Sequence, residues 1–97
     1  MKVEKILTMN EKTILDYMLK NNGCGARSTV DLIEDNYSYQ SIADLKNVIE
    51  GFNKHQLGGV LSSMLQKGIL SLDERDDDCD LFFINDTWLE THKTLTW

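Results

Sequence analysis

The sequence lacks the features that mark membrane-spanning, secreted and zinc-binding proteins. No stretch approaches the roughly 18 consecutive apolar residues of a membrane-spanning helix, and residues 1–5 contain no apolar run of the kind that forms a secretory signal. The spacings of its few cysteines and histidines fit no zinc site. These residues are Cys24, Cys79, His55 and His92. We therefore expect a cytoplasmic protein with free thiols, no bound metal and no contact with a membrane.

The chain also lacks the residue patterns that enzymes need. It has no arrangement of Ser, His and Asp typical of nucleophilic catalysis and no glycine-rich loop of the kind that cradles phosphate. Outside one acidic segment it has no pair of candidate catalytic carboxylates. We expect neither enzymatic activity nor a cofactor.

What the chain does contain is an ordinary globular composition, with 41% hydrophobic and 27% charged residues in a length of 97. This length matches one small domain and leaves no room for a second. We therefore expect a single folded domain over residues 1–97.

The net charge of −6 is concentrated in one short segment. Residues 1–72 contain eight acidic and eight basic residues, whereas residues 73–80 combine six acids with one base, a net charge of −5. The six acids are Asp73, Glu74, Asp76, Asp77, Asp78 and Asp80. Asp76, Asp78 and Asp80 alternate as the ligands of a calcium-binding loop do, but the segment has neither the central glycine nor the final glutamate of such a loop. It is expected to be a solvated loop or a surface that meets a basic protein.

Capping residues and apolar spacing predict helices in the first half of the chain. The first helix is expected to begin near Thr8 or Asn10, and Thr8 and Glu11 have the spacing of a capping box. A left-handed stop is expected at residues 21–23. The apolar face between them consists of Ile14, Leu15, Met18 and Leu19. Ser28 or Thr29 can cap a short second helix that ends near Ile33. Residues 36–40 then break the pattern, either as a short extended segment or as a cover over the core.

The second half of the chain has stronger signals. Ser41 caps a helix that is expected to end at Glu50 and Gly51, and Asn53 caps a further helix that is closed by Gly68. Apolar residues in this further helix match the amphipathic template completely: Leu57, Val60, Leu61, Met64 and Leu65. The period then changes to that of a strand in residues 69–72 and again in residues 81–84, which predicts a two-stranded hairpin. A terminal helix capped by Asn85 or Asp86 follows.

This order of elements resembles the winged helix-turn-helix family. The resemblance rests on a helix from Ser41, a turn with Gly51, a capped helix from Asn53, and the Lys67-Gly68-Ile69-Leu70 exit into a hairpin. It implies a mostly helical α+β fold. The helix-turn-helix would span about residues 41–67, the hairpin wing about 69–85 and a C-terminal helix about 86–96.

The resemblance implies sequence-specific binding of double-stranded DNA by a transcriptional regulator. In the family the second helix of the pair enters the major groove, and its outward side chains contact base edges while nearby lysines contact phosphate. The corresponding residues are Lys54, His55, Gln56, Gly59, Ser62 and Ser63 for the bases, and Lys46 and Lys67 for phosphate. Gln can pair with adenine through two hydrogen bonds. Gly58 and Gly59 weaken the helix and suggest close approach by another backbone, within the fold, in a dimer or on DNA.

Two further expectations concern protein partners. The family often pairs through terminal helices, so Trp88, Leu95 and Trp97 either cover the core or form a homodimer interface. The acidic wing opposes binding to phosphates, because six carboxylates surround a single arginine in residues 73–80. The alternative function is therefore a protein-interaction module, an adaptor, inhibitor or nucleic-acid mimic of the kind that phages encode, whose acidic wing binds a basic protein surface.

Overall fold

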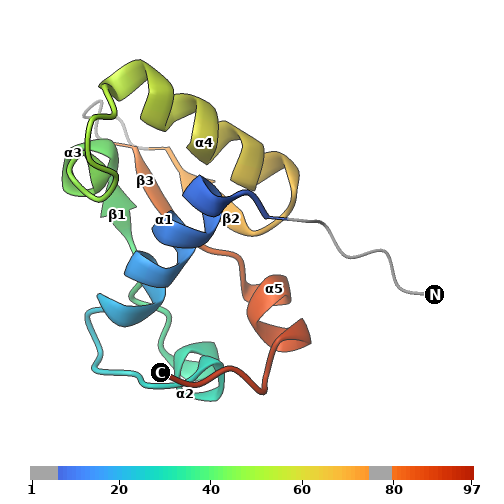
Figure 1. The fold of residues 1–97 in the computed structure, drawn as a ribbon. Coiled ribbons are helices and arrows are strands. Elements are labelled where there is room, and N and C mark those ends of the chain that lie inside the picture. Colours follow the sequence, from blue (N-terminus) through green and yellow to red (C-terminus); the bar gives the residue numbers. More distant parts are fainter. Residues whose placement is uncertain (1–6, 75–79) are drawn as a thin grey trace.

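The computed structural model describes residues 7–74 and 80–97, which form an α+β fold with about half of these residues in helices (Figure 1). The fraction in helices is lower than the mostly helical fold predicted from the sequence. In chain order the elements are α1 (Met9–Lys20), α2 (Thr29–Glu34), β1 (Gln40–Ser41), α3 (Ile42–Leu45), α4 (Lys54–Gln66), β2 (Leu70–Asp73), β3 (Leu81–Ile84) and α5 (Asp86–Thr91).

Side-chain caps begin all five helices, and these caps confirm the predicted helix starts. In each case a Ser, Thr or Asn oxygen accepts a hydrogen bond from a backbone N–H in the first turn. The caps are Thr8, Ser28, Ser41, Asn53 and Asn85. Three of these are full capping boxes, in which the side chain three residues later bonds back to the cap N–H. Local sequence therefore determines where these helices begin.

The helix from Ser41 and the C-terminal helix both end earlier than predicted. The helix that starts at Ser41 ends at Leu45 and not at Glu50, and the chain continues through turns to Gly51, whose φ is 84°. Val48 and Ile49 are half-buried and pack against the core from these turns, so their apolar character did not require a helix. Helix α1 ends at Lys20, directly before the predicted stop, but neither Asn21, with a φ of −109°, nor Gly23 has a left-handed backbone.

The sheet has three antiparallel strands in the order β1-β3-β2, not the two predicted. The hairpin of β2 and β3 pairs Leu70 with Ile84 and Asp73 with Leu81, as the expected wing requires. The additional strand β1 is only two residues long and pairs Gln40 with Phe82. A strand this short shows no alternation, which explains why residues 36–40 remained ambiguous in the sequence.

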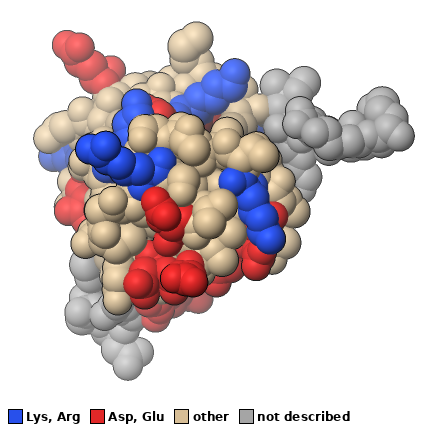
Figure 2. All heavy atoms as spheres, turned by 90° about the horizontal axis from the view of Figure 1, so that it is seen from below, with Lys and Arg blue, Asp and Glu red and all other residues tan. Residues whose placement is uncertain are grey.

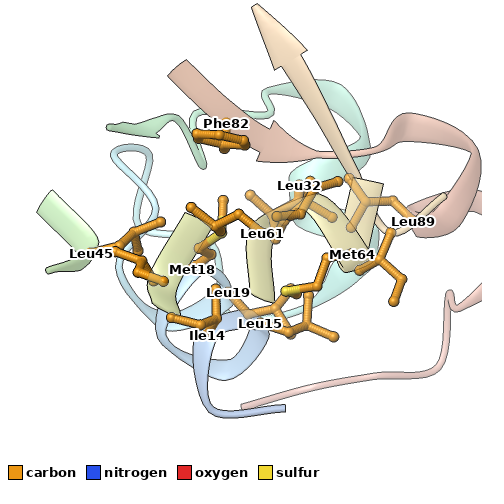
Figure 3. Packing of buried hydrophobic residues seen from close by; sticks show 14 of the residues in the cluster. Ile14, Leu15, Met18, Leu19, Leu32, Leu45, Leu61, Met64, Phe82 and Leu89 are labelled. Atoms are coloured by element: carbon orange, nitrogen blue, oxygen red, sulfur yellow. The ribbon is translucent and has the colours of Figure 1, made fainter. Parts of the chain in front are cut away.

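The core lies between α1, α4 and the inner face of the sheet (Figure 3). All four residues of the predicted α1 face are buried, as are Leu57, Leu61 and Met64 of α4. The sheet contributes Phe82 and Ile84. Alternation in β3 places Leu81 and Phe83 on the opposite, outer side of the sheet.

The C-terminal segment packs against α2 at one end of the molecule, where Leu32 and Leu89 extend the same core (Figure 1). Helix α5 ends at Thr91, short of the predicted residue 96. The chain after it returns to α2: Thr29 N–H donates to Leu95 O at 3.1 Å, and Trp97 N–H donates to Arg27 O at 2.8 Å. These bonds require extended backbone near residue 96, so the helix could not continue.

Candidate nucleic-acid interface

Helix α4 presents one polar stripe to solvent. His55, Gly59, Ser62 and Gln66 follow each other at spacings of three and four residues and are all exposed, so they share one side of the helix. Lys54 and Gln56, also exposed, flank this stripe at the first turn. We call these six residues the outward face of α4. Gln66 was not among the predicted contact residues, although its spacing of eleven residues from His55 places it on the same side of the helix.

Gln56 is partly occupied by the capping box. Its Oε1 accepts from Asn53 N–H at 2.9 Å, and its own N–H donates to Asn53 Oδ1 at 2.8 Å. Pairing with adenine through two hydrogen bonds needs both the oxygen and the amide group of the side chain. With the cap intact, the Nε2 group of Gln56 keeps both of its donors, whereas its Oε1 is already engaged in one hydrogen bond.

Ser63 and Lys67 lie on another side of α4, against α1. Lys67 Nζ lies 2.6 Å from Glu11 Oε1, and Ser63 Oγ donates to Glu11 Oε2 at 2.6 Å. The Glu11 side chain is 2% exposed and the Lys67 side chain 25%. Two of the residues expected to contact DNA are therefore part of an internal contact between α1 and α4, which we call the Glu11 cluster.

Glu11 is the strongly perturbed carboxyl in the described part of the chain. Burial raises its pKa, but hydrogen bonds from Lys67, Ser63 and the Thr8 N–H, together with the charge of Lys67, lower the pKa from 4.5 to about 2. The carboxylate is therefore ionised at neutral pH and holds three donors from two helices. The capping role of Glu11 was predicted, but the link to residues more than fifty positions away was not visible in the sequence.

Gly58 and Gly59 leave open space on the surface of α4. A Cβ added at either position would meet no atom within 4 Å, so among the described residues no backbone approaches them closely. The suggestion that the glycines serve packing within the fold is therefore wrong for this part of the chain. Together with Ile42, Lys54 and His55 they line a shallow hollow of about 560 Å³.

The stretch of chain that contains α4 has no acidic residues. Residues 51–72 contain no Asp or Glu, although the whole chain has 16 of them. Lys46 is exposed at the C-terminal end of α3, where the turn that leads to α4 begins. By contrast, Figure 2 shows acidic side chains gathered on part of the surface at the bottom of Figure 1, where α2 and the C-terminus lie.

The acidic segment is described only at its two ends. Asp73 ends β2 and is half-buried, whereas Glu74 and Asp80 are exposed. The remaining predicted protein-contact residues, Asp76, Asp77 and Asp78, lie outside the described residues, as does Cys79. Cys24 is a free, exposed thiol.

The residues expected at a dimer interface make contacts within the chain. Trp88 is half-buried against the core and stacks on His92 with ring centroids 4.2 Å apart. Trp97 donates from Nε1 to Ala26 O at 2.9 Å, and the Leu95 side chain is 39% exposed. Both tryptophans thus cover the core, the first of the two roles expected, and a homodimer stays a prediction.

The described residues offer no group of three or more His, Cys, Asp and Glu side chains placed to hold a metal ion. No helix among them has the length and apolar character needed to cross a membrane. Comparison of the chain with protein-family models, curated proteins and solved structures finds no match. Any function therefore has to be argued from the surfaces themselves.

Proposed function

We propose that this chain is a winged helix-turn-helix protein that binds duplex DNA through the outward face of α4 and acts as a transcriptional regulator. The order of elements supports the fold assignment: a short helix, a turn, a capped longer helix and a strand hairpin follow each other from residue 41 to residue 84. The third strand β1 ties the start of this unit to the hairpin.

The observation that supports the proposal most strongly is that the outward face is polar, exposed and without acidic residues. It is a polar, exposed stripe on a helix of 13 residues, about 20 Å long, in a stretch of chain without acids. A helix of this size fits the major groove, about 12 Å wide. Leu57, Leu61 and Met64 bury the apolar side of α4, so the exposed His55, Ser62 and Gln66 of the stripe are not needed for packing of the described core.

Base readout is assigned to side chains that the fold leaves accessible. Ser62 and Gln66 offer donors and acceptors, and Gln56 offers its Nε2 donor. Lys54 and Lys46 lie at the two ends of the turn between α3 and α4 and are assigned to phosphates. Lys67 and Ser63 are assigned to the Glu11 cluster instead.

A negative charge on the outward face tests this proposal most sharply. The change Gly59→Glu meets open space and replaces a poor helix former with a better one, so the fold is expected to be retained. Close approach to phosphates should then be opposed by like charge, and affinity for a random-sequence duplex pool at low ionic strength should fall at least about tenfold. Fluorescence anisotropy of the labelled duplex measures this change.

Val30→Glu is the matched control, because Val30 is exposed on α2, away from the outward face, and the change adds the same charge. It should leave DNA affinity within about twofold of the unmodified chain. Equal losses in the two variants would point to net charge alone. Absence of salt-dependent binding by the unmodified chain at low ionic strength would contradict the proposal as a whole.

A further inference from the structure

The outer side of the sheet carries an aromatic pair. Tyr39, just before β1, and Phe83 of β3 stack with ring centroids 4.7 Å apart and an interplanar angle of 26°. Phe82 and Ile84 point into the core, so Phe83 and Leu81 lie on the other side. Tyr39 is 39% exposed. We call Tyr39, Leu81 and Phe83 the outer sheet patch.

This patch differs from the other exposed apolar residues. The other exposed large apolar residues are spread along the chain, which is normal for a protein surface: Met9, Val30, Tyr37, Leu72 and Leu95. Leu72 pairs with Phe82 and so lies on the other side of the sheet from this patch. In the outer sheet patch the half-buried Leu81 and Phe83 lie beside the exposed Tyr39, so an aromatic pair and an aliphatic side chain share one side of the sheet. Such clustering is typical of a surface that meets a partner.

Acidic residues border the patch. Asp73 pairs directly with Leu81 across the β2–β3 ladder, so its side chain lies on the same side of the sheet. Glu74 and Asp80 continue from the two strand ends, and residues 73–80 carry a net charge of −5. Aromatic rings beside a surplus of negative charge oppose nucleic acid and favour a cation.

We propose that the outer sheet patch, with the acidic ends of β2 and β3, docks an arginine-rich segment of another protein. An arginine guanidinium is planar and weakly hydrated, so it stacks on aromatic rings and pairs with a carboxylate through two hydrogen bonds, whereas a lysine ammonium is a strongly hydrated point charge that does neither as well. The outer sheet patch therefore distinguishes arginine from lysine, and the acidic ends of the strands supply the general attraction. This interaction is separate from DNA binding, because α4 packs on the inner side of the sheet.

Two synthetic peptides of equal charge test the proposal, one alternating Arg with Gly and the other alternating Lys with Gly. With the full chain labelled by ¹⁵N, the Arg peptide should bind several-fold more tightly and shift the amide signals of Tyr39, Leu81 and Phe83. Tyr39→Ala should weaken binding of the Arg peptide about fivefold and nearly abolish the difference between the peptides. Tyr39→Leu keeps apolar area against Phe83 and should show the same loss if Tyr39→Ala does not fold.

Control variants separate the contribution of the aromatic pair from that of the acidic residues. Met9→Ala removes another exposed apolar side chain and should leave binding unchanged, whereas Glu74→Gln should weaken both peptides equally. Glu34→Gln removes the same charge from α2 and should have little effect. Equal affinity for the two peptides, or shifts centred on α2, would overturn the proposal. Tyr39→Leu should keep its DNA affinity and Lys54→Ala its peptide affinity, so failure of one proposal can be told from failure of the other.

Discussion

The side of α4 that faces α1 and the outward face of the same helix carry similar polar side chains in different surroundings. Toward α1, Lys67 and Ser63 bind a carboxylate that is 2% exposed, and their positions are determined by the fold. On the outward face, Lys54 and Ser62 are exposed. Residue type alone therefore does not separate a structural lysine from one that can contact a ligand.

The comparison also shows how the outward face is held in place. Glu11 caps Thr8 at the start of α1 and binds two residues near the end of α4, so one side chain fixes the relative position of two helices. Burial of Leu57 and Leu61 then orients the opposite side of α4 to solvent. The Glu11 cluster therefore helps to fix the orientation in which α4 presents its outward face.

Loss of the buried carboxylate should have the largest effect. Glu11→Ala leaves Lys67 and Ser63 without their common acceptor and removes half of a capping box, so we expect a loss of about 3–5 kcal/mol in the free energy of unfolding. Urea denaturation measures this loss. In the control Glu90→Ala, the exposed pair with Lys93 is broken and the loss should stay below about 0.5 kcal/mol. Similar losses in the two variants would contradict the structural role of the Glu11 cluster.

Acid should weaken the inner side of α4 and spare the outward face. The pKa of Glu11 is lowered from 4.5 to about 2 in the folded chain, so its contribution is fully present above about pH 4.5 and is lost as the pH falls toward 2. This shift corresponds to roughly 3 kcal/mol. The stability difference between the unmodified chain and Glu11→Gln should therefore shrink between pH 5 and pH 2, as measured by denaturation at each pH. A constant difference would show that the carboxylate charge is not what Lys67 binds.

The sequence predicted the local features well because their causes are local. The cap of each helix lies next to the helix, and the apolar spacing of α1 and α4 identifies the buried residues directly. The hairpin of β2 and β3 was predicted for the same reason, since a short run rich in aromatic and β-branched residues at 81–84 is itself a strand signal. These elements also determine which side of α4 is exposed.

The features that escaped prediction depend on residues far apart in the chain. Strand β1 has two residues and exists because Gln40 and Ser41 meet β3. Buried Ser38 accepts a hydrogen bond from Ile84 N–H at 2.9 Å, which no local pattern indicates. The end of α5 depends on Thr96 pairing with Ser28. In the candidate site, the sequence alone does not show that Lys67 has a structural role and Lys54 does not. That difference follows from the contact between Lys67 and Glu11, which are far apart in the chain.

The smallest predicted effect has the opposite sign and belongs to the outward face. Gly59→Ala fills open space in an exposed helix interior, so the free energy of unfolding should rise by about 1 kcal/mol. Gly68→Ala also meets no neighbouring atom, but the φ of 75° at Gly68 strains any residue with a Cβ, and stability should fall by about 1 kcal/mol. Thermal denaturation of the two variants separates the two effects, because both positions have room for a Cβ and only Gly68 has a positive φ. A loss of stability in Gly59→Ala would mean that α4 is not a regular helix with open space at Gly59. It would then contradict the description of the outward face as an accessible surface.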